Sequence, residues 1–190
     1  MRTTILITSL LTLGLLTGCT ANQSKDVTTQ APKTETTTNQ ALQKPKITLE
    51  KAGALYQKQY PNSDLTEVEL KQFGRHTFYE LTGMSDNEEL HMHVDANNGT
   101  VSQLGKETLD TDEQNGRERQ QKRLIFDQLI SVKQAMQKAQ RYFSGTIVKW
   151  SLEKDDGRAI WEINGKHKRQ IMQVKLDAET GALIEKEIDD

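Results

Sequence analysis

Two matching stretches decide the fold: residues 92–99, Met-His-Val-Asp-Ala-Asn-Asn-Gly, and residues 174–181, Val-Lys-Leu-Asp-Ala-Glu-Thr-Gly. Each begins as an alternating strand and ends in Asp-Ala-x-x-Gly. In such a turn the Asp side chain binds backbone amides and the Gly takes a positive φ. Because the motif occurs twice, we assign it to the fold and not to metal or acid chemistry. The predicted structural turn residues are Asp95, Gly99, Asp177 and Gly181.

The similarity extends from these turns toward the N-terminus of each copy. Residues 47–52, Ile-Thr-Leu-Glu-Lys-Ala, match residues 130–135, Ile-Ser-Val-Lys-Gln-Ala. Residues 78–83, Phe-Tyr-Glu-Leu-Thr-Gly, match residues 160–165, Ile-Trp-Glu-Ile-Asn-Gly. The first pair lies 83 residues apart and the later pairs 82 apart, so one deletion after the first element explains the change. This nearly constant spacing indicates an internal repeat.

Each copy is predicted to open with a helix. In the second copy Ser131 and Gln134 form a capping box. An apolar stripe at helical spacing follows it, made by Val132, Ala135, Met136, Ala139 and Phe143. In the first copy Thr48 is the expected cap, and Pro61 ends the helix because proline cannot continue the backbone ladder.

Alternating segments follow each helix, as half-buried strands require. The predicted fold is therefore α+β: two tandem two-layer units, each with one helix packed on an antiparallel sheet of about four strands. The units are assigned to residues 47–110 and 130–190. A charged linker at 111–129 joins them and is expected to be partly helical from Arg117. Its apolar residues, Leu124 to Phe126 and Leu129, are expected to pack between the units.

The N-terminus has the pattern of a signal peptide, with an apolar run over residues 3–17 that is short for a membrane-spanning helix. The following Leu16-Thr17-Gly18-Cys19 resembles the bacterial lipobox. That resemblance implies a signal peptide at 1–18 and a diacylglyceryl group on Cys19, which anchors the protein on the extracytoplasmic face of the cell membrane. An ordinary secretory signal and a retained transmembrane anchor are the alternatives.

Residues 19–46 comprise Cys19 and a Thr-rich and Gln-rich segment without periodic apolar residues. We expect this segment to be a disordered tether, because it has no apolar face to bury. The tether shows no sorting signal after Cys19, which favours a Gram-positive cell surface.

Composition excludes several classes of protein. The 190-residue chain carries a net charge of −2 without a Lys/Arg-rich face, so nucleic acid is not an expected partner. Its single Cys excludes a disulfide scaffold, and its single short apolar run excludes a polytopic membrane protein. The sequence contains no Ser/His/Asp set, Gly-rich phosphate loop or His-Glu-x-x-His pattern. We therefore expect no enzyme activity, cofactor or small-molecule substrate.

Three residue groups could still carry chemistry. His91 and His93 share one strand face and could bind zinc with His76, but a solvated polar face is the preferred interpretation. Glu80 and Glu162 occupy matching strand positions in separate units, which favours exposed structural carboxylates over acid/base catalysis. The aromatic pair Tyr79 and Trp161 could form a ligand surface, and is assigned to the core. No metal site is predicted.

The repeated pattern resembles the PepSY domain. The resemblance rests on the Ile-Ser/Thr-hydrophobic-x-x-Ala helix, the aromatic-Glu-hydrophobic strand and the hydrophobic-Asp-Ala-x-x-Gly hairpin. The second copy is the closer match, since the first departs at Gly53 and around Phe73-Gly74. The resemblance implies an extracytoplasmic protein that binds a peptidase in the cell envelope and inhibits or regulates it in trans. The alternative is a structural or adaptor module that binds other envelope components without protease involvement.

Overall fold

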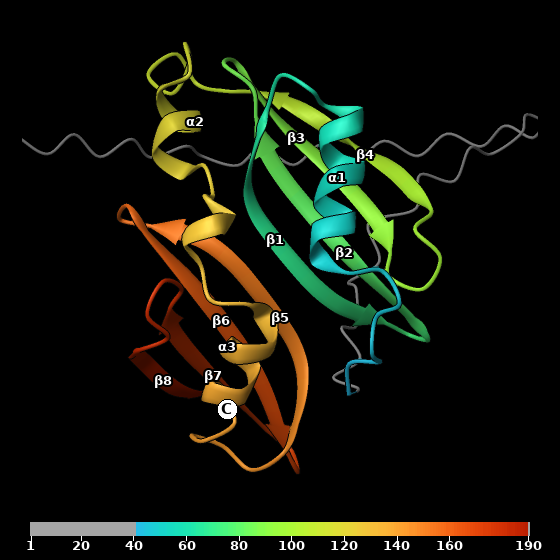
Figure 1. Cartoon of the computed structure of the whole chain (residues 1–190), viewed down its shortest axis with the longest axis vertical. Coiled ribbons are helices and arrows are strands. Elements are labelled where there is room, and N and C mark those ends of the chain that lie inside the picture. Colours follow the sequence, from blue (N-terminus) through green and yellow to red (C-terminus); the bar gives the residue numbers. More distant parts are fainter. Residues whose placement is uncertain (1–40, 190) are drawn as a thin grey trace, which may run out of the picture. The chain divides into compact units, whose positions relative to one another are not determined.

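The computed structural model of the chain describes residues 41–189, apart from the side chains of residues 103, 104 and 189. Within this part, eight antiparallel strands form one sheet in the order β4-β3-β2-β1-β5-β6-β7-β8 (Figure 1). The strands are β1 (Asp64–Phe73), β2 (His76–Met84), β3 (Glu88–Asp95), β4 (Val101–Thr108), β5 (Thr146–Asp155), β6 (Arg158–His167), β7 (Gln170–Asp177) and β8 (Leu183–Asp189).

The helices begin where their capping residues predict. Helix α1 (Leu49–Gln59) follows Thr48, whose hydroxyl accepts the Lys51 backbone N–H. Helix α3 (Val132–Ala139) follows Ser131, and the predicted capping box with Gln134 is present. Helix α3 ends before Phe143, so the predicted stripe is wrong at its last position: Phe143 reaches the core from the turn after the helix.

Each repeat contains one helix and four strands, which confirms the predicted α+β architecture. Figure 1 shows α1 over the β1–β4 half of the sheet and α3 over the β5–β8 half, on the same face. The matched residues hold each helix in an equivalent way. The Ile47 backbone N–H donates to Ala96 O, and its carbonyl accepts the Tyr79 hydroxyl at 2.8 Å. In the second repeat Ile130 donates to Ala178 O and accepts the Trp161 indole N–H.

The two repeats are joined edge to edge at their first strands. Strands β1 and β5 pair over five positions, from Glu67 opposite Glu153 to Lys71 opposite Lys149. The apolar residues of both repeats consequently form a single buried cluster on the helix-covered face. Trp150 lies at its centre, 6.0 Å from the Tyr79 ring and 5.4 Å from the Trp161 ring, measured between centroids. An edge-to-face aromatic row therefore crosses from one repeat to the other.

One strand glycine in each repeat allows an aromatic side chain to pack directly against the sheet backbone on the helix-covered face. A Cβ at Gly83 would lie 2.1 Å from the Tyr56 hydroxyl oxygen and 2.5 Å from the Asp64 carbonyl oxygen. A Cβ at Gly165, the matching residue of the second repeat, would lie 2.0 Å from Phe143 Cε2. Both glycines are buried, so close approach of an aromatic side chain requires them.

The connection between the repeats is ordered along the sheet. Helix α2 (Arg117–Lys122) begins at Arg117 as expected, and a short 3-10 helix, η1 (Phe126–Gln128), precedes α3. Leu124 is buried and its N–H donates to Leu65 O of β1, as the expected packing of the linker requires. The prediction is wrong for Ile125 and Phe126, which remain 39% and 40% exposed.

The last residues of the predicted tether contact the folded part. The Leu42 N–H donates to Ile147 O in β5 at 2.9 Å, and the Leu42 side chain packs against the core. Lys46 N–H donates to Ala96 O at 2.8 Å. Residues 42–47 thus contact both repeats before α1 begins.

Candidate functional site

The Asp-Ala-x-x-Gly motifs lie in the β3–β4 and β7–β8 turns. Asp95 Oδ1 accepts the N–H groups of Asn97 and Asn98, and Asp177 Oδ1 accepts those of Glu179 and Thr180. Gly99 has φ 77° and Gly181 has φ 70°, both in the left-handed region. Hydrogen bonds from Thr180 lower the pKa of Asp177. Each carboxylate therefore forms its hydrogen bonds within its own turn.

The three histidines of the zinc hypothesis are not brought together. His91 Nε2 contacts Glu89 at 3.0 Å and His93 Nε2 contacts Glu80 at 3.5 Å, whereas His76 lies at the exposed β1–β2 turn. Among residues 41–189, no group of three or more His, Cys, Asp and Glu side chains could hold a metal ion.

Glu80 and Glu162 lie on the same face of one sheet and not in two separate sheets, yet they remain apart, as the preferred structural interpretation requires. The register runs from Glu80 through Glu69 and Ser151 to Glu162, across the β1–β5 junction. Three strand spacings separate the two carboxylates, or about 14 Å at 4.8 Å per strand. They are therefore too far apart to act on one bond.

A charged network covers the junction on the face opposite α1 and α3. Glu69, only 9% exposed, lies between Lys71 Nζ at 2.9 Å and Lys149 Nζ at 2.5 Å. Lys71 also contacts Glu80 at 2.5 Å. The hydrogen bonds from His93 and from Lys71 lower the pKa of Glu80 to about 2, against the opposing effect of burial. Glu80 is therefore a structural carboxylate and not a proton donor near neutral pH.

Two further carboxylates face each other directly across the junction. Glu67 of β1 is opposite Glu153 of β5. Burial, followed by repulsion from Glu153 and Glu69, raises the pKa of Glu67. Burial, followed by repulsion from Glu162, raises the pKa of Glu153. The pairing of the repeats therefore carries an electrostatic cost at neutral pH, which Lys149 partly offsets because it lowers the pKa of both carboxyl groups.

Tyr79 and Trp161 are core residues, as preferred from the sequence. Each is 1% exposed, and each donates its polar hydrogen to the residue before a helix cap. Burial raises the pKa of Tyr79 to about 12, so its hydroxyl remains a proton donor over the physiological range. Trp161 also lines a groove, which connects it to a surface that the sequence did not indicate.

That surface, called here the inter-repeat groove, lies on the helix-covered side. It is bounded by α1, the start of β1, residues 124–132 and Trp161 of β6, and has a volume of about 600 Å³. Its apolar walls include Leu49, Leu65, Leu124, Ile130 and Val132. Clefts of this volume with mainly apolar linings are typical of binding sites.

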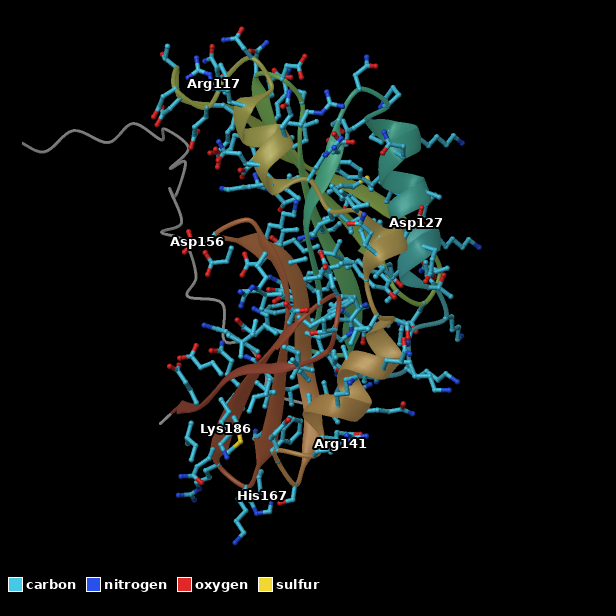
Figure 2. The ribbon with its side chains drawn as sticks, turned by 60° about the vertical axis from the view of Figure 1, so that its left-hand side comes forward. Arg117, Asp127, Arg141, Asp156, His167 and Lys186 are labelled. Carbon is cyan, nitrogen blue, oxygen red and sulfur yellow. The ribbon has the colours of Figure 1, made fainter. Side chains whose placement is uncertain are left out.

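All ionisable side chains that line the inter-repeat groove are carboxylates: Glu50, Asp64 and Asp127. Asp64 accepts the Arg119 Nε–H at 2.8 Å. Glu50 and Asp127 form no ion pair with other residues of the described part. Asp127 lies on the side of the sheet that carries α1 and α3 (Figure 2), and it lines the groove together with residues of α1.

The outer edges of the sheet form a second candidate surface. Strands β4 and β8 end the strand order, so within residues 41–189 their outer edges have no strand partner. Strand β8 also exposes three large apolar side chains, Leu183, Ile184 and Ile188. An edge strand with free backbone groups can pair with an extended segment of another protein.

The predicted lipidation site, Cys19, lies outside the described residues. No helix within residues 41–189 is both long and apolar enough to span a bilayer.

The fold and these surfaces define a tandem α+β protein whose two repeats share one sheet. The chain belongs to the PepSY family: the family described as "Peptidase propeptide and YPEB domain" matches residues 46–102 and 129–187, more than half of the chain. A search of curated proteins found no match. A crystal structure of a candidate lipoprotein from Clostridium difficile 630 is similar, with a TM-score of 0.72 and 26% identity. The similarity covers 77% of this chain and 96% of that one.

Sequence reasoning missed both the inter-repeat groove and the carboxylate pair. Leu124 and Phe126 were visible as an apolar cluster after a charged run, but nothing in the pattern placed them beside α1. Glu67 and Glu153 hold different positions in the two repeats, since Glu67 corresponds to Lys149 and Glu153 to Lys71, and only the pairing of β1 with β5 brings them face to face.

Proposed function

We propose that this protein is a lipoprotein held on the extracytoplasmic face of the cell membrane through Cys19, where its folded part binds a peptidase and restrains its activity. The lipobox-like sequence supports the anchor, as does the similarity to the C. difficile candidate lipoprotein. Membership of a family named after peptidase propeptides supports the partner. The protein acts by binding and not by catalysis, on a Gram-positive cell surface.

The proposed organisation follows the sequence boundaries. A signal peptide over 1–18 precedes the modified Cys19 and a tether to residue 46, whose last residues, from Leu42 on, contact the folded part. PepSY units at 47–110 and 130–190 follow, joined by residues 111–129. Two acyl chains on Cys19 would hold the protein firmly, because each buried CH₂ contributes about 0.8 kcal/mol.

The observation that carries the binding function is the open edge of β8. Its exposed Leu183, Ile184 and Ile188 accompany backbone groups that have no strand partner within the described part. A peptidase segment that pairs with β8 would be held as an added strand and kept away from substrates. Strand β8 is an edge of the single sheet on which the core of both repeats packs.

The anchor is tested by fractionation of cells that produce Cys19→Ser, with Thr20→Ser as the matched neighbour. Cys19→Ser is expected in the culture medium or as an unprocessed precursor. Thr20→Ser should stay in the membrane, and mass spectrometry should detect its lipid. Normal processing and membrane retention of Cys19→Ser would contradict the anchor.

The partner is tested by capture of envelope proteins on the immobilised full chain, followed by a casein-cleavage assay of the captured fraction. We expect a peptidase whose activity falls when the free chain is added. The double variant Ile184→Lys/Ile188→Lys should lose this effect, since lysines on an edge oppose strand addition. Val101→Lys, an exposed residue of the opposite edge strand, is the matched control. Capture of wall polymer or assembly proteins without peptidase would instead favour the adaptor function.

A further inference from the structure

We propose that the inter-repeat groove binds a partner-protein segment whose apolar side chains are flanked by Lys or Arg. This inference rests on the proposed function only in that the partner is a protein. It concerns the groove and not the β8 edge, and it specifies the side chains that the bound segment must carry. Three independent features of the groove support it.

The first feature is an apolar interior next to an exposed aromatic ring. Leu65, Leu124 and Trp161 line the groove and belong to the core, each less than 10% exposed. Phe126 lines the same groove yet is 40% exposed. A large aromatic side chain at the mouth of an apolar cleft is typical of a residue that dominates a binding interface.

The second feature is a pair of small residues where the middle of α1 lines the groove. Gly53 and Ala54 are both lining residues, and Ala54 is exposed. A Cβ at Gly53 would meet only Leu65 Cδ1, at 3.5 Å, and the Gly53 φ lies outside the left-handed region. Neither packing nor backbone geometry requires this glycine, although glycine is unfavourable inside a helix. Its effect in the structure is to keep the groove open.

The third feature is the charge of the rim. Its ionisable groups are all carboxylates, and Glu50 and Asp127 have no ion-pair partner in the described part of the chain. A segment with basic flanks would place its charges against these two groups, whereas an acidic segment would be repelled. The apolar interior and the acidic rim together specify an apolar core with cationic ends.

The test uses the purified full chain and two fluorescein-labelled peptides in fluorescence polarisation. Both have a Leu-Phe-Leu-Leu core, flanked on each side by two lysines in one peptide and by two glutamates in the other. The lysine peptide is expected to bind at least about tenfold more tightly in low salt. The difference should shrink at high ionic strength, because salt screens exposed charges.

Two sets of variants separate the groove from general effects of charge and folding. Glu50→Lys/Asp127→Lys should reverse the peptide preference, whereas Glu107→Lys/Glu179→Lys, with the same change in net charge at exposed positions outside the groove, should preserve it. Gly53→Met should fill the groove and weaken binding of the lysine peptide while the melting temperature rises. This combination of opposite effects cannot result from misfolding.

Equal binding of the two peptides would overturn the proposal, as would an unchanged preference in Glu50→Lys/Asp127→Lys. Preferential binding of lipid vesicles that displaces the lysine peptide would also overturn it, and would assign the groove to a lipid. Failure of this inference differs from failure of the proposed function. Loss of the peptide preference while the peptidase is still captured would refute only the former, and absence of any captured peptidase would refute only the latter.

Discussion

Replacement of Trp150 by Ala tests whether the two repeats fold as one unit. The side chain is 2% exposed and contacts aromatic rings of both repeats. Truncation of a buried Trp costs about 3–5 kcal/mol. For a protein of roughly this size, about 2–4 °C of melting temperature is lost per kcal/mol, so the midpoint should fall by about 6–20 °C.

The assay combines thermal unfolding with amide hydrogen exchange measured by mass spectrometry. Because the core is a single cluster, we expect one transition and simultaneous loss of protection in β2–β3 and in β6–β7. Ile188→Ala, at a position 54% exposed, is the control and should cost less than about 0.5 kcal/mol. Two separate transitions would refute the reasoning, as would a first repeat that stays protected while the second exchanges freely.

Three further predictions concern local features. Gly83→Ala and Gly165→Ala should each lower stability by about 1–3 kcal/mol in denaturant titrations, because each new methyl overlaps an aromatic side chain; unchanged midpoints would contradict the close approach. Glu67→Gln should raise the free energy of unfolding at pH 7 by less than about 1 kcal/mol, which thermal unfolding would record as a higher melting temperature. Its folded-state pKa is raised, so the carboxylate destabilises the fold above that pKa, and the gain should vanish on acidification below about pH 4; a gain that grows with acid would reverse the sign. Arg119→Ala should increase hydrogen exchange in α2 at a cost of only about 1 kcal/mol, because it removes contacts to Asp64 and Asp86 near the surface; unaltered exchange in α2 would show that these ion pairs do not hold the helix.

The architecture of each repeat could be predicted because its signals are local. Capping residues mark the start of α1 and α3, and alternation marks the strands. The backbone of Ile47 joins two parts of the first repeat, because its N–H donates to Ala96 O and its carbonyl accepts the Tyr79 hydroxyl. Ile130 makes the equivalent hydrogen bonds in the second repeat. The end of α3 was less predictable, since Phe143 keeps helical spacing but contacts Gly165 from a turn.

The candidate sites were predicted only in part. Local reasoning placed Tyr79 and Trp161 in the core, because aromatic residues at inward strand positions are usually buried. It could not find the inter-repeat groove, whose walls come from four separate segments of the chain. It also assigned Glu80 and Glu162 to separate sheets, because a repeat in sequence does not reveal whether two sheets merge.

The sequence by itself determined the repeat, the helix starts, the strand alternation and the PepSY motifs, because each depends on residues close together in the chain. Only the tertiary structure decided that β1 pairs with β5. That choice merges two small cores into one, buries Glu69 between two lysines and opens a groove between the helices. The physical reason is that strand edges pair through backbone groups common to every residue, so the choice of neighbour depends on how the completed cores and charges fit together.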